Sequence, residues 1–277
     1  MALVLLCAGC VAQAPRPGTP AATSASVEPS VPTGPGIEAE AVQLRTDVPI
    51  GGQFQVRITA TGDEPFTVGE VALDSAGFAP LPPTDDVAEF APGRVIDLPT
   101  PFGDPRCGEP AEPAVAEVTL ERPGAAPERV RLPLAAEVLG DIHTDECAAT
   151  ALGKVVEVGV ADLVPDGEAL AGALTLTRRS GEEEVRVVRL SRSVLLDVDA
   201  ELPAVLPGSE ADGEVALRFT LATCDAHVLA ETKQPFRFPL AVEVGDDEAV
   251  TLDLPLDDST EAQLADLVHR VCTARNG

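Results

Sequence analysis

Cysteine and histidine are the residue types whose spacing in this chain could support chemistry. The 277 residues include six cysteines and three histidines. Near the C-terminus, Cys224 and His227 form a C-x-x-H motif, and His269 and Cys272 form an H-x-x-C motif. Two thiolates and two imidazoles at such spacing are suitable ligands for a tetrahedral zinc ion. In an exported protein, the same two cysteines would instead oxidise to a disulfide.

An internal repeat favours the disulfide interpretation. The turn that begins at Gly62 precedes Cys107 by 45 residues, and the turn that begins at Gly181 precedes Cys224 by 43. A hairpin follows each of these cysteines, and a further cysteine closes each copy. We therefore predict the bridges Cys107–Cys147 and Cys224–Cys272. The first copy lacks the C-x-x-H motif, so zinc stays a second hypothesis, and no metal or cofactor is predicted.

The segments that carry these cysteines have β-strand patterning. Phe54, Val56, Ile58 and Ala60 alternate with polar residues, and turn signals recur every 8–12 residues. We predict an all-β fold of two tandem immunoglobulin-like β-sandwich domains, 37–150 and 151–277. One large β domain is the alternative.

A short C-terminal helix is expected to follow the last strand of the second copy. Asp258 or Thr260 is predicted to cap it. Its apolar face would carry Leu264, Leu267, Val268 and Val271.

The N-terminus has the pattern of an export signal. The apolar run 2–8 is shorter than the ~20 residues that span a bilayer. The run leads into Cys7-Ala8-Gly9-Cys10, which resembles the lipobox of bacterial lipoprotein signal peptides. That resemblance implies a signal peptide at 1–9 and lipidation of Cys10. Residues 10–36 are rich in Pro, Ala, Ser and Thr, which is typical of a tether. A plain secretory signal is the alternative.

The composition adds a family resemblance. The chain is rich in Ala, Val, Gly, Pro, Asp, Glu and Arg, and it has two lysines, Lys154 and Lys233. Together with the lipobox-like Cys10, the tether and the paired cysteines, this resembles uncharacterised lipoproteins of actinobacterial type. The resemblance implies a protein anchored by lipid to the cell membrane, on its extracytoplasmic face. It implies no particular activity.

Charge and missing motifs limit the function classes. A net charge of −27 argues against nucleic acid as a partner, and the absence of Trp and Tyr argues against stacking platforms. The chain has no G-x-S-x-G, S-x-x-K, H-E-x-x-H, P-loop or G-x-G-x-x-G motif. We predict no enzymatic activity and no catalytic residue. A protein-binding or scaffolding module with an envelope protein partner is the leading hypothesis. A small-molecule or metal-binding accessory lipoprotein, a structural spacer and a carboxylate hydrolase are the alternatives.

Overall fold

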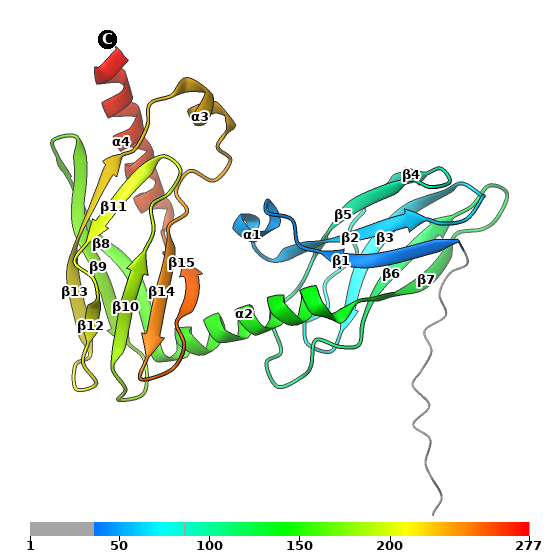
Figure 1. The fold of residues 1–277 in the computed structure, drawn as a ribbon, viewed down its shortest axis with the longest axis horizontal. Coiled ribbons are helices and arrows are strands. Elements are labelled where there is room, and N and C mark those ends of the chain that lie inside the picture. Colours follow the sequence, from blue (N-terminus) through cyan, green and yellow to red (C-terminus); the bar gives the residue numbers. More distant parts are fainter. Residues whose placement is uncertain (1–35, 86, 277) are drawn as a thin grey trace, which may run out of the picture. The chain divides into compact units, whose positions relative to one another are not determined.

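The computed structural model describes residues 36–85 and 87–276, and within them the fold is mostly β (Figure 1). The first group of strands forms a three-stranded antiparallel sheet, β1-β2-β5, and a four-stranded antiparallel sheet, β4-β3-β6-β7, called here the first sandwich. Its strands are β1 (Ile37–Val42), β2 (Gln53–Ala60), β3 (Phe66–Ser75), β4 (Ala88–Phe90), β5 (Val95–Pro101), β6 (Ala114–Glu121) and β7 (Glu128–Leu134).

The remaining strands form the second sandwich, which has two four-stranded antiparallel sheets. Their orders are β11-β13-β9-β8 and β12-β10-β14-β15. The strands are β8 (Val156–Asp166), β9 (Ala169–Arg178), β10 (Val185–Leu190), β11 (Leu196–Ala200), β12 (Ala204–Leu206), β13 (Asp212–Leu221), β14 (Pro239–Val244) and β15 (Val250–Asp253).

The two sandwiches repeat one strand order. The sheet β1-β2-β5 corresponds to β8-β9-β13, and β4-β3-β6-β7 corresponds to β12-β10-β14-β15. The second sandwich adds the edge strand β11 and the short helix α3 (Ala226–Glu231) between β13 and β14. The predicted repeat of turns and cysteines therefore lies on equivalent connections. Immunoglobulin-like topology and the division into two domains stay predictions.

The helices are longer than the sequence indicates. Each sandwich is followed by a helix, α2 (Ala136–Val155) and α4 (Asp258–Asn276), and a four-residue helix, α1 (Asp47–Ile50), precedes β2. The alternating pattern gave little sign of α2, and the expected boundary at residue 150 lies inside it. Leu139 and Ile142 belong to the first core and Leu152 to the second. Because its two ends are buried in different cores, α2 has no continuous apolar stripe.

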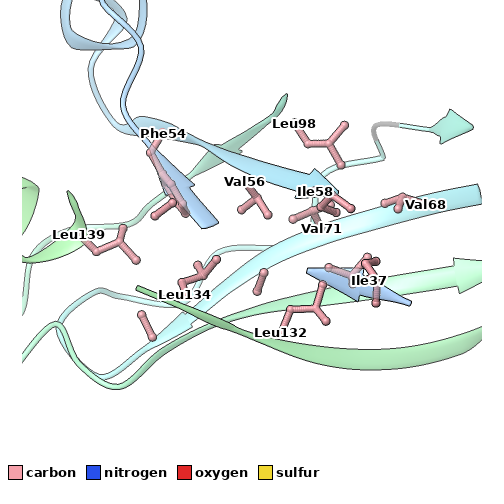
Figure 2. Packing of buried hydrophobic residues seen from close by; sticks show 14 of the residues in the cluster. Ile37, Phe54, Val56, Ile58, Val68, Val71, Leu98, Leu132, Leu134 and Leu139 are labelled. Atoms are coloured by element: carbon pink, nitrogen blue, oxygen red, sulfur yellow. The ribbon is translucent and has the colours of Figure 1, made fainter. Parts of the chain in front are cut away.

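The alternating apolar residues of the strands form the core. Phe54, Val56, Ile58 and Ala60 of β2 are all at most 1% exposed, as predicted, and Figure 2 shows the first three among the packed side chains of the first core. The face of α4 is also confirmed, because Leu264, Leu267 and Val271 are buried in the second core. Each sandwich thus has its own apolar core.

Candidate functional site

Two disulfides join the equivalent connections to the helices. Cys107, between β5 and β6, is bonded to Cys147 of α2, and Cys224, between β13 and β14, is bonded to Cys272 of α4. This is the pairing that the repeat predicts. Cys224 and Cys272 therefore offer no free thiolate to zinc, and within residues 36–85 and 87–276 no group of three or more metal-ligating side chains is assembled. Cys10 lies outside the described residues.

Histidine takes a different environment beside each bridge. In the first sandwich, His143 Nε2 lies 3.7 Å from Cys147 Sγ. Its ring packs nearly perpendicular to the ring of the buried Phe78, with the centroids 5.4 Å apart. Glu146 lies one turn further along α2, and its burial and the nearby Asp145 raise the pKa of its carboxyl group. In the second sandwich, His269 is exposed on α4. The two bridges are therefore equivalent in position but not in surroundings.

A conspicuous surface lies at the end of the second sandwich where three connections meet, and we call it the acidic end. The β9–β10, β12–β13 and β14–β15 connections carry seven exposed carboxylates there, and Asp212 begins β13 beside them. The seven are Glu182, Glu183, Glu184, Glu210, Asp246, Asp247 and Glu248. No sequence pattern joins these residues, because they lie on three separate turns.

Arg178 holds this end together. Its guanidinium donates hydrogen bonds to the carbonyl oxygens of Glu183 (2.8 Å), Pro207 (2.9 Å) and Glu210 (2.9 Å), and to that of Leu206 (3.3 Å). These carbonyls belong to the β9–β10 connection and to the residues around the β12–β13 connection. The arginine therefore fixes the backbone of two loops and leaves their carboxylates facing water.

A backbone hydrogen bond, an ion pair and a close glycine contact join the three loops further. Gly245 donates its amide to the carbonyl of Glu184 (2.8 Å), and Arg186 forms an ion pair with Glu243 (2.8 Å). Gly208 lies so close to the carbonyl oxygen of Glu182 that an added Cβ would come within 1.9 Å of it. Such tight packing between turns leaves the acidic end little freedom to rearrange.

The opposite end of the second sandwich holds an apolar pocket of about 660 Å³, lined in part by residues of α3 and α4. Figure 1 shows these two helices at that end of the sandwich. Its apolar walls are formed by Leu195, Leu229, Pro235, Phe236, Ala265 and Val268. Thr232, His269, Cys272 and Thr273 complete the lining. We call this the α3–α4 pocket. None of its lining residues is Asp, Glu, Lys or Arg, although the chain holds 46 acidic residues.

The α3–α4 pocket could not be predicted from the sequence, because Phe236 alternates with Phe238 and Leu240 in a pattern typical of a strand. The structure begins β14 only at Pro239, and Phe236 lies in the preceding connection. Proline at 235 and 239 flanks this segment, and proline cannot donate a ladder hydrogen bond. That pair of prolines was the available signal. A helix as short as α3 has too little periodicity to be recognised from sequence.

Comparisons with known proteins leave the family undefined. No family model matches the chain, and no curated protein sequence matches it. Among solved structures, the YadV chaperone is 12% identical with a TM-score of 0.23, over 80% of this chain and all of that one. Red sea bream transglutaminase is 11% identical with a TM-score of 0.24, over 80% of this chain and 32% of that one. Among the described residues, no helix is both long and apolar enough to cross a membrane.

Proposed function

We propose that the chain is a lipid-anchored cell-envelope protein, on the extracytoplasmic face, whose folded part binds a protein partner without catalysing a reaction. The lipobox-like Cys10 and the Pro-rich segment 10–36 support the anchor. The acidic end of the second sandwich is the observation that carries the binding role. Loops presented by a rigid scaffold are common binding surfaces.

The acidic end is pre-organised, which favours binding. Arg178 donates to four carbonyls around two connections, and the third connection is joined to them by the Gly245 amide. A surface that is already ordered loses less conformational entropy when a partner binds. Seven exposed carboxylates on its loops favour a partner with a basic surface, and they would speed its association at low salt.

The strand edges are less suitable for partner binding than the loops. The three longest edge strands are β5, β7 and β8. Pro99 and Pro101 interrupt β5, and Pro133 interrupts β7. In β8, the register shifts between Ala161 and Val164, next to Asp162 with its φ of +55°. Proline and bulges of this kind block the addition of a further strand. The proposal therefore places the partner on the loops.

The first experiment is cross-linking in living cells with the anchored chain as bait. We expect one envelope protein with a basic surface to be enriched, and a Cys10→Ala chain to capture much less of it. No enrichment over background, or equal capture by the Cys10→Ala chain, would contradict the anchored adaptor. Turnover of a substrate by the purified chain would contradict the non-catalytic role.

A charge-neutralised variant locates the interface. In Glu182→Gln/Glu183→Gln/Glu184→Gln, three carboxylates of the acidic end are removed while the hydrogen bonds that their backbone makes remain. We expect at least a tenfold loss of affinity for the captured partner. The matched control neutralises three exposed carboxylates of the first sandwich, as Asp63→Asn/Glu64→Gln/Glu109→Gln, and keeps the same net charge. Equal losses in both variants would mean that the effect is only one of net charge.

A further inference from the structure

Phe236 is an exception among the phenylalanines. The chain has eight, all within the described residues, and the other seven are at most 8% exposed. Phe236 is only half-buried, and it lines the α3–α4 pocket. Leu229 and Val268 beside it are also half-buried. In a chain this poor in aromatic residues, a partly exposed phenylalanine in a concave apolar wall is a sign of ligand binding.

The first sandwich provides an internal comparison. Next to its own helix and disulfide, Phe78 and Phe102 are buried, with ring centroids 5.2 Å apart, and Phe78 contacts His143. Two buried aromatic side chains thus lie together near that helix. In the second sandwich, the inserted helix α3 forms a wall, and His269 faces a pocket of about 660 Å³. Phenylalanine beside the helix is therefore buried in one copy and lines a pocket in the other.

The lining indicates the chemical class of ligand. None of its residues is Asp, Glu, Lys or Arg, so an ionised group would lose its hydration without gaining a partner of opposite charge. The net charge of −27 disfavours anions further. The polar side-chain groups of the lining are the hydroxyls of two threonines, an imidazole and the bridged sulfur of Cys272. Thr232 Oγ1 already donates to the Val228 carbonyl (2.7 Å), which leaves its lone pairs to accept a hydrogen bond.

We propose that the α3–α4 pocket binds an uncharged amphiphile, a small molecule with an apolar body and one hydrogen-bonding end such as an alcohol or an amide. The apolar body packs against Leu229, Phe236 and Val268, and the polar end lies near Thr232, His269 and Thr273. A volume of about 660 Å³ lies within the range of small-molecule sites, roughly 300–1,000 Å³. This site lies at the end of the sandwich away from the acidic loops, so it does not rest on the proposed partner binding.

The test uses straight-chain alcohols with the full-length chain. The chain lacks Trp and Tyr, so Phe236→Trp introduces a single fluorescent reporter into the pocket wall. We expect 1-octanol to give a saturable blue shift, and calorimetry on the unsubstituted chain to give the same affinity. From hexanol to decanol, the affinity is expected to rise about three- to fourfold for each added methylene. Octanoate and octylammonium are expected to bind at least tenfold more weakly than octanol.

Two alanines of α4 supply a matched pair of variants. Ala265 lines the pocket, whereas Ala262, one turn earlier, is exposed and lies outside the lining. We expect Ala265→Phe to weaken octanol binding at least tenfold and Ala262→Phe to leave it within twofold. The proposal is overturned if octanol gives no saturable signal, if the charged probes bind equally well, or if Ala265→Phe binds normally. The comparison of octanol with octanoate and octylammonium uses the unsubstituted chain. It therefore tests the proposal even if Ala265→Phe fails to fold.

The two proposals are separable in one further measurement. The triple variant Glu182→Gln/Glu183→Gln/Glu184→Gln is expected to bind octanol with unchanged affinity, because its substitutions lie at the other end of the sandwich. A parallel loss of octanol and partner binding would overturn the assignment of two independent sites. Loss of partner binding alone supports it.

Discussion

Arg57 and Asp97 lie directly opposite each other on β2 and β5 and form a bidentate ion pair. Arg57 Nε is 2.6 Å from Asp97 Oδ1, and Nη2 is 2.9 Å from Oδ2. The hydrogen bond from Arg57 is the main reason why the pKa of Asp97 lies below its usual value. A cross-strand pair of this geometry stabilises the register of the two strands.

The first prediction concerns acid stability. The folded state lowers the pKa of Asp97. The stabilisation by its ion pair is therefore complete at pH values above the pKa of an aspartate in the unfolded chain, about 3.9. This stabilisation is lost as the pH falls through the pKa that Asp97 has in the folded state. We expect Asp97→Asn to lower the free energy of unfolding by up to about 1 kcal/mol at pH 7, since both side chains are partly exposed. Urea denaturation from pH 2 to pH 7 is the measurement, and a difference from the unsubstituted chain that does not shrink at low pH would contradict the assignment.

The second prediction concerns the bridge of the second sandwich. The bond between Cys224 and Cys272 has a sequence separation of 48 residues. In the chain-entropy model, this constraint stabilises the fold by about 4 kcal/mol. The variant Cys224→Ser/Cys272→Ser is expected to lose much of that in urea denaturation. Alkylation of the unsubstituted chain without reductant should label none of its four bridged cysteines, and labelling of all four would disprove both bridges.

The third prediction concerns the start of α4. The backbone amide of Thr260 donates to Asp257 Oδ1 (2.7 Å), so Asp257 is the N-cap rather than Asp258 or Thr260, the residues expected from the sequence. Hydrogen bonds from the hydroxyl and amide of Thr260 lower the pKa of Asp257. We expect Asp257→Ala to destabilise the protein and Asp258→Ala to do so less, because only the first removes the cap. The measurement is thermal unfolding of the two variants. A larger loss of stability in Asp258→Ala would assign the N-cap to Asp258 instead.

The fourth prediction concerns glycine within helix α2. Gly140 lies in the helix interior, and an added Cβ would meet nothing within 4 Å. Gly140→Ala is therefore expected to stabilise the protein by about 1 kcal/mol. The control is Gly172→Ala in β9, where the new Cβ would come within 2.6 Å of the Ala161 carbonyl oxygen. Gly172→Ala should therefore be less stable than the unsubstituted chain. Equal melting temperatures for Gly140→Ala and Gly172→Ala would contradict this packing.

Strand patterning and disulfide pairing were predictable from the sequence. In β2, apolar residues occupy every second position and face one core, because successive side chains of a strand point to opposite faces. The order of turns and cysteines repeats, and equivalent cysteines form equivalent bridges. The alternation is a local pattern, and the order of turns and cysteines recurs within the chain. Both can therefore be recognised without knowledge of the three-dimensional structure.

Helix α2, the acidic end and the α3–α4 pocket depend on the tertiary structure. The buried residues of α2 belong to two cores, so no single periodic stripe reveals the helix. The acidic turns lie far apart in the sequence and meet because the antiparallel sheets of the second sandwich return each hairpin to the same end. Phe236 and His269 share a pocket because β13 and β14 are joined through α3, which lines that pocket together with α4. The sequence by itself determined which residues alternate into a core and which cysteines pair. Only the folded chain decided which surfaces those elements bring together, because such contacts join residues that no local pattern connects.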